Sequence, residues 1–113
     1  IKKIAKRYNL KISIKQILEL ESKSFNKQIR STIEEVASSL NLPHQEIISG
    51  AGHDAVNVND IAPTGMIFIP CVDGISHNET EKALDQDISA GAQVLLHSMI
   101  KLADKPIKTN KNI

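Results

Sequence analysis

The stretch GMIFIPCV, residues 65–72, is apolar along almost its whole length. A continuous apolar run of this length is typical of a β-strand that is buried on both faces of a sheet. The short apolar run at residues 46–48, which leads into a glycine-rich turn at 49–52, predicts a second strand of the same kind. Such strands have to be covered by helices, so amphipathic segments are expected on either side of them.

Two amphipathic helices are predicted around this run. The first follows Ser24 and is ended by the sequence Asn41-Leu42-Pro43. The second is predicted to have Asp85 as its N-cap and Asp87 in its first turn. Residues 25–113 are therefore predicted to form an α/β fold, followed by a polar tail at 106–113. The apolar positions at helical spacing are Ile29, Ile33, Val36, Ala37 and Leu40 in the first helix and Ile88, Ala92, Leu95, Leu96, Met99, Leu102 and Ala103 in the second.

The first 24 residues follow a different pattern. Ile1, Ala5 and Tyr8 recur at helical spacing, which predicts the last turns of an amphipathic helix that ends near Asn9. From residue 10 to residue 22, apolar side chains fall mainly on even positions, which predicts one long half-buried strand or a bent pair. Residues 1–24 and 25–113 are therefore predicted to be two different units.

Composition limits the classes of function open to the chain. Its 113 residues carry a formal net charge of +1 and one cysteine, Cys71, which excludes a disulfide framework and a cysteine-based structural zinc site. Residues 1–30 hold nine Lys or Arg and two Glu, but stacking aromatic residues are scarce there, so we expect a solvated face rather than a nucleic-acid interface. Neither an apolar run of about 18 residues nor a secretory leader is recognisable. We therefore expect a cytoplasmic protein with no nucleic-acid or membrane partner.

Two loops carry the polar side chains that follow the predicted strand ends, where ligands of open α/β sheets bind. In SGAGHDA, residues 49–55, small residues would let the backbone approach an anion. In GISHNETE, residues 74–81, an imidazole flanked by carboxylates is typical of a metal ligand or a general base. Each loop also has a simpler interpretation, a tight turn at a helix start for the first and a single exposed histidine for the second.

Three stretches together resemble one family: SGAGHDA at 49–55, PTGMIFIPCVDGISHNETE at 63–81 and DISAGAQVLLHSMIKLA at 87–103. They are similar to the C-terminal part of the hydantoinase/carbamoylase-type amidases, which include N-carbamoyl-L-amino acid hydrolases and allantoate amidohydrolases. The resemblance is strong over residues 25–104 and weak over 1–24. It implies that 25–113 are part of a mixed-sheet, zinc-peptidase-like catalytic domain with helices packed on the sheet. Residues 1–24 would then be the end of an α+β lid and dimerisation domain.

The resemblance also implies roles for single residues. His77 would ligate one of two divalent metal ions (Zn, Mn or Co), and His53 would contact the substrate and polarise its amide or ureido carbonyl. The backbone of Gly52 would bind the substrate carboxylate. Glu81 would orient His77 without itself binding the metal, and the alternative is that Glu81 is an ordinary surface charge. Asp54 would support the site in the same way, or only cap the helix that follows it.

The function that the resemblance implies is that of a C-terminal fragment of a metal-dependent amidohydrolase. Such an enzyme cleaves linear C–N bonds in small N-carbamoyl amino acid or ureido substrates, and the intact form is expected to be a homodimer. Because the family's other metal ligands and its general base lie upstream of these motifs, the 113 residues alone are expected to be inactive. Two alternatives stay open: a non-catalytic binding module that keeps the fold, and an aminopeptidase-like hydrolase of dipeptides.

Overall fold

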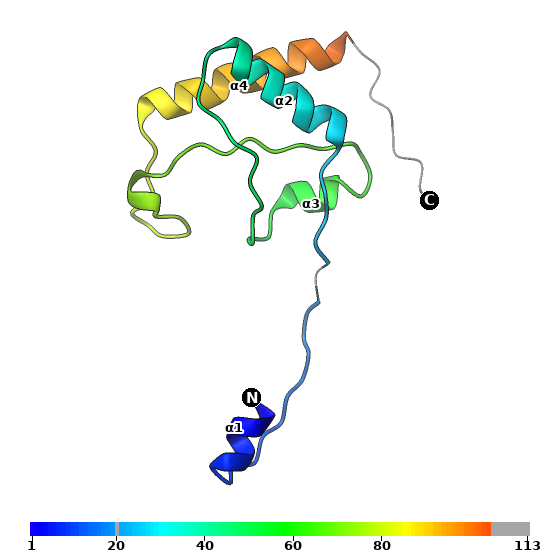
Figure 1. Cartoon of the computed structure of the whole chain (residues 1–113), viewed down its shortest axis with the longest axis vertical. Helices are drawn as coiled ribbons and strands as arrows, with labels where there is room; N and C mark the ends of the chain where they lie inside the picture. Colours follow the sequence, from blue (N-terminus) through cyan, green and yellow to red (C-terminus); the bar gives the residue numbers. More distant parts are fainter. Residues whose placement is uncertain (20, 105–113) are drawn as a thin grey trace.

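The computed structural model describes residues 1–19 and 21–104, so the predicted tail at 106–113 lies outside the described residues. Four helices and one 3-10 turn follow one another along the described chain (Figure 1). They are α1 (Lys2–Arg7), α2 (Lys27–Ser39), α3 (Asp54–Val58), the 3-10 turn η1 (Val72–Gly74) and α4 (Asp85–Ala103). The helices predicted near the N-terminus, after Ser24 and before the tail are confirmed.

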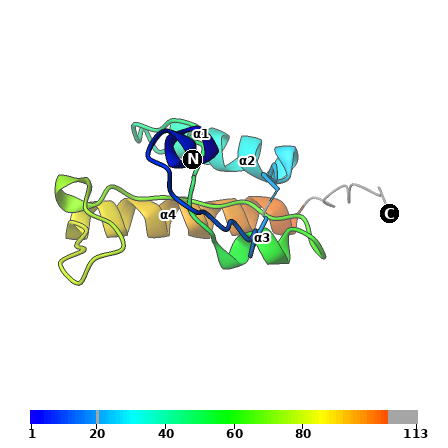
Figure 2. The ribbon, with the colours of Figure 1, turned by 90° about the horizontal axis from the view of Figure 1, so that it is seen from below.

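The packing of α2 against α4 forms the core of the described chain. Figures 1 and 2 show α2 lying across α4, and Val36 and Ala37 of α2 are buried there with Val94 of α4. The stripe predicted for α2 is the face that makes this contact. Asn26 starts the helix, because its side-chain oxygen accepts a hydrogen bond from the backbone N–H of Ile29 at 3.1 Å. The cap at Asn26 and the buried apolar face both indicate the same helical segment for α2.

The start of α4 corrects one prediction. The N-cap is Leu84, whose backbone is extended (φ −77°, ψ 147°) and whose side chain makes no capping bond, whereas Asp85 is the first residue inside the helix. Asp85 and Asp87 both lie in the first turn, where their carboxylates interact favourably with the positive end of the helix dipole. The acidic residues therefore mark the helix start by charge rather than by a capping bond.

The strands predicted at residues 10–22, 46–48 and 65–72 are not observed, because the described residues contain no β-strand. A strand requires a neighbouring strand to accept and donate its ladder hydrogen bonds, and no second extended segment pairs with residues 65–72 within the described chain. The segment instead runs along α4 (Figure 1). A Cβ atom added to Gly91 of α4 would lie 2.5 Å from Cγ2 of Ile69, so the two backbones approach closely at this point. Side-chain packing on α4, not sheet pairing, holds the segment here.

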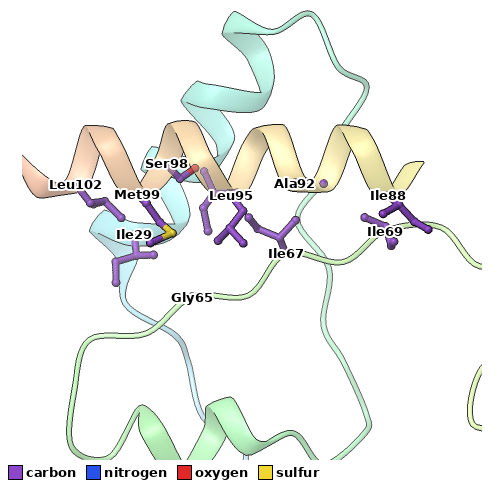
Figure 3. A pocket seen from close by; sticks show the side chains of 12 residues that line it. Ile29, Gly65, Ile67, Ile69, Ile88, Ala92, Leu95, Ser98, Met99 and Leu102 are labelled. Atoms are coloured by element: carbon purple, nitrogen blue, oxygen red, sulfur yellow. The ribbon is translucent and has the colours of Figure 1, made fainter. Parts of the chain in front are cut away.

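An apolar hollow of about 380 Å³ lies between this segment and the helices (Figure 3). Ile67 and Ile69 line it from the segment, and Ile29 lines it from α2. On α4, Ile88, Leu95 and Met99 are 50, 52 and 61% exposed even though they face this hollow. The apolar face of α4 is therefore wider than the surface that α2 and residues 65–69 cover.

The linker after residue 21 is attached to the end of α3. Lys23 forms an ion pair with Asp60, and the side-chain amide of Asn59 donates to the carbonyl of Ser24 at 3.3 Å. The backbone N–H of Asn26 donates to the carbonyl of Thr64 at 2.9 Å. The helix α1 lies apart from the α2–α4 pair at the far end of an extended stretch (Figure 1). Residues 23–26 are thus tied to the part of the chain that carries the two histidine loops.

Candidate functional site

Two contacts of its ring hold His53 at the start of α3. It occupies the N-cap position with an extended backbone (φ −132°, ψ 144°). Its Nε2 lies 2.7 Å from Oγ of Ser49, and its ring meets the ring of Phe68 edge-on, with centroids 5.4 Å apart and planes at 66°. The imidazole therefore contacts both its own glycine-rich turn and the segment at 65–72.

His77 lies in a loop that is closed at its base. The N–H of Val72 donates to the carbonyl of Lys82 at 2.7 Å, which brings the two ends of residues 72–82 together. His77 itself has a positive φ of 57°, a left-handed conformation that costs a residue with a Cβ about 1–2 kcal/mol. Its backbone N–H donates to Oε2 of Glu81 at 2.8 Å. The carboxylate thus stabilises an unfavourable backbone conformation at the histidine.

The structure brings the two predicted histidines to one hollow of about 790 Å³, whose walls include His53 and His77. Glu81 lines the same hollow, and its Oε1 accepts a longer hydrogen bond from the thiol of Cys71 at 3.8 Å. Besides these groups, Phe68 and Lys82 contribute to the lining. A small polar molecule in this hollow would meet two imidazoles, a carboxylate, a thiol and an aromatic ring.

Gly52 and Asp54 lie beside His53 in the chain but are not among the described residues that line the hollow. A Cβ built on Gly52 would meet nothing within 4 Å, so crowding does not require a glycine at this position. Asp54 is the first residue inside α3, whose N-cap is His53 with no side-chain capping bond, so the capping alternative for Asp54 is wrong. Their predicted roles in substrate binding and support stay predictions.

The imidazole of His77 makes no hydrogen bond to any residue of 1–19 or 21–104, so both ring nitrogens are available to a ligand. A neutral imidazole is a common ligand of Zn²⁺ and of other divalent transition metals. Within the described chain, however, no three His, Cys, Asp or Glu side chains are grouped so that they could hold a metal ion. The described residues therefore supply at most part of a metal site, since catalytic zinc takes at least three protein ligands.

Sequence reasoning did not assign roles to Ser49, Phe68 and Cys71, although all three contact predicted site residues. Ser49 belongs to the glycine-rich motif and lies four residues before His53. This short spacing between a hydroxyl and an imidazole could have predicted the contact between them. Phe68 and Cys71 gave no such signal, because an apolar run does not indicate which of its residues face a cavity.

None of the described helices combines the length and the apolar character that are needed to cross a membrane.

The chain is similar to known proteins in family, in sequence and in structure. The model of peptidase family M20/M25/M40 matches residues 7–101. The N-carbamoyl-L-amino-acid amidohydrolase of Rhizobium meliloti is 37% identical over 102 residues, which are 90% of this chain and 24% of that protein. The allantoate amidohydrolase of Escherichia coli K12 is 34% identical over 100 residues, 88% of this chain and 24% of that enzyme.

Among solved structures, an amidase of the hydantoinase/carbamoylase family from Burkholderia multivorans superposes with a TM-score of 0.86 at 43% identity. The match covers 94% of this chain and 26% of that one. These similarities confirm the resemblance drawn from the three motifs. The chain spans about a quarter of the length of the curated relatives that it matches.

Proposed function

The chain belongs to peptidase family M20/M25/M40, and from this premise we propose that it is the C-terminal part of a metal-dependent amidohydrolase. The proposed reaction is hydrolysis of a linear C–N bond in an N-carbamoyl amino acid or an allantoate-type ureido compound. The observation that carries the proposal is the meeting of His53 and His77 at one hollow, although they lie 24 positions apart in the sequence. The names of the Rhizobium and Escherichia relatives support the substrate class.

His77 is the proposed metal ligand of this chain. Its imidazole has no partner in the described chain and lines the hollow, which suits a group that is to bind a divalent ion. We propose two such ions, Zn²⁺, Mn²⁺ or Co²⁺, in the complete site, with the remaining ligands supplied from outside the described residues. When bound, the ions would supply a water molecule that is nucleophilic near neutral pH.

Glu81 is the proposed positioning residue for His77. Metal-binding histidines are usually oriented by a carboxylate that accepts a hydrogen bond from the free ring nitrogen. Here the carboxylate accepts from the backbone N–H of His77 instead, at 2.8 Å. Glu81 would therefore fix the conformation of the histidine's backbone, and only through it the direction of the ring.

His53 is the proposed substrate-binding and catalytic residue. A hydrogen bond from its ring to the carbonyl oxygen would stabilise the negative charge that develops there in the transition state. The backbone N–H of Gly52 would bind the substrate carboxylate, since the space around its Cα is open. Asp54 would hold its carboxylate at the start of α3 and keep the histidine's helix in place.

The remaining proposals concern the parent protein. Residues 65–72 would become a strand of a mixed sheet when neighbouring strands are present, and α2 and α4 would cover one face of that sheet. Residues 1–24 would be the end of a lid and dimerisation domain, in a homodimer located in the cytoplasm. The isolated 113 residues are expected to bind metal weakly and to be inactive.

The test compares two variants of the intact protein. His77→Ala is expected to lower the metal content and abolish turnover, whereas His53→Ala is expected to lower turnover and retain metal. Metal content is measured by plasma mass spectrometry, and turnover with an N-carbamoyl amino acid, allantoate and a dipeptide. His97→Ala, which removes an exposed imidazole from α4, is the matched control. Equal metal loss in both variants would refute the division of roles, and turnover of the dipeptide alone would favour an aminopeptidase.

A further inference from the structure

The side chain of Ser49 joins the glycine-rich turn to the ring of His53. Its Oγ accepts a hydrogen bond from the backbone N–H of Ala51 at 3.2 Å and lies 2.7 Å from Nε2 of His53. A serine hydroxyl has two acceptor lone pairs and one proton to donate. With one lone pair used by Ala51, the hydroxyl keeps its proton and its second lone pair, and Nε2 is the only further polar contact that the structure gives this side chain within the described residues. Donation to Nε2 is the arrangement that gives the hydroxyl proton an acceptor among those residues.

Phe68 also contacts the ring of His53 and restricts its rotation. The edge-on contact between the two rings, at 5.4 Å and 66°, opposes rotation of the imidazole about its own axis. The hydroxyl at Nε2 meanwhile fixes one edge of the ring. Nδ1 makes no hydrogen bond to any other described residue. It is therefore the ring nitrogen that a molecule in the hollow would find available.

We infer that Ser49 is a positioning residue for His53, whose hydroxyl donates to Nε2 and so places the ring proton on Nδ1. In a neutral imidazole one nitrogen carries the proton and the other accepts. A proton donated to Nε2 therefore selects the tautomer in which Nδ1–H is a donor. This inference rests on the proposed function, because Nδ1–H would be the group that donates to the substrate carbonyl.

The hydrogen bond is tested without any turnover by nitrogen NMR of the intact protein labelled in its histidines. Protonated and unprotonated ring nitrogens differ widely in chemical shift, and His53→Ala identifies the signals of His53. We expect a protonated Nδ1 and an unprotonated Nε2, a mixture of the two tautomers in Ser49→Ala, and the original spectrum in Ser49→Thr, which keeps the hydroxyl. A protonated Nε2 in the unaltered protein, or an unchanged spectrum in Ser49→Ala, would overturn the inference.

The chain offers a matched control elsewhere. Oγ of Ser38 lies 3.4 Å from Nε2 of His44, and neither residue lines the hollow that contains His53. Ser38→Ala removes the same kind of serine–histidine contact and should leave the His53 signals and the turnover as they are. If Ser38→Ala alters the His53 spectrum as much as Ser49→Ala does, the effect is not local and the inference fails.

Kinetics test the consequence for the reaction. Ser49→Ala is expected to lower kcat about tenfold with little change in KM, because one hydrogen bond orients a group that acts in the transition state. Ser49→Thr should recover most of the loss. An altered His53 spectrum with unaltered kcat would overturn the positioning role. Full activity of His53→Ala would overturn the proposed role of His53 itself. The nitrogen spectrum of Ser49→Ala tests only the hydrogen bond. A failure of the inference and a failure of the proposed function therefore give different results.

Discussion

Replacement of Glu81 by glutamine tests how the proposed metal ligand is held. The carboxylate accepts hydrogen bonds from the N–H of His77 at 2.8 Å and from the thiol of Cys71 at 3.8 Å. A hydrogen bond to a charged group contributes about 1.5–3 kcal/mol, and the exposure of Glu81 to solvent favours the lower value. The left-handed conformation of His77 costs about 1–2 kcal/mol. The two terms are similar, so the charge of Glu81 is needed to offset the conformation of His77.

Glu81→Gln is therefore expected to release the backbone of His77 and to weaken metal binding about tenfold, which corresponds to about 1.4 kcal/mol. Competition with a chromogenic chelator measures the affinity in the intact protein. Hydrogen exchange of residues 72–82, followed by mass spectrometry in the absence of metal, measures the loop directly. The amide of His77 should exchange faster in the variant.

Glu79→Gln is the matched control, because it removes one negative charge from the same loop, and Glu79 makes no hydrogen bond or ion pair with the described residues. It should leave both the exchange and the affinity as they are. Equal weakening in the two variants would show that loop charge alone matters. Unchanged exchange at His77 in Glu81→Gln would refute the reasoning from the hydrogen bond.

Three further predictions concern single contacts. Gly91→Ala is expected to lower stability by about 1–2 kcal/mol in thermal unfolding, because the new Cβ would lie 2.5 Å from Cγ2 of Ile69. In the Ile69→Ala variant, where that Cγ2 atom is absent, adding Gly91→Ala should raise the stability relative to Ile69→Ala alone, since alanine is a better helix former than glycine. Asn26→Ala removes the cap of α2 and should cost about 1 kcal/mol in the same assay, with Asn26→Asp close to the original protein. Cys71→Ser keeps a donor for Glu81 and should retain metal affinity, whereas Cys71→Val should lower it; identical affinities would exclude a role for the thiol.

The helices could be predicted from the sequence because their signals are local. The stripe from Ile29 to Leu40 and the stop at Pro43 lie within one segment, and the buried face of α2 is the predicted one. Strand formation depends on a partner elsewhere in the chain, so the apolar run at 65–72 could not by itself tell a strand from an extended segment packed on a helix. The prediction that Asp85 is the N-cap of α4 was wrong because aspartate is favourable both at the N-cap and in the first turn of a helix.

The candidate site could be predicted only in part. Motif resemblance pointed to His53 and His77, and both line the hollow. The backbone conformation of His77 gave no signal, because glycine and asparagine are the residues that usually mark a positive φ. The contact between Cys71 and Glu81 depends on the closure of the loop at 72–82, which residue spacing does not reveal.

The short helix α3 connects the glycine-rich turn at 49–52 to the linker after residue 21. His53 stands at one end, and Asn59 and Asp60 at the other end hold Ser24 and Lys23 of the linker. An α-helix rises about 1.5 Å per residue, so the two ends of this five-residue helix lie within about 8 Å of each other. The linker after residue 21 and the imidazole of His53 are thus attached to opposite ends of one five-residue helix, outside the core that α2 forms with α4.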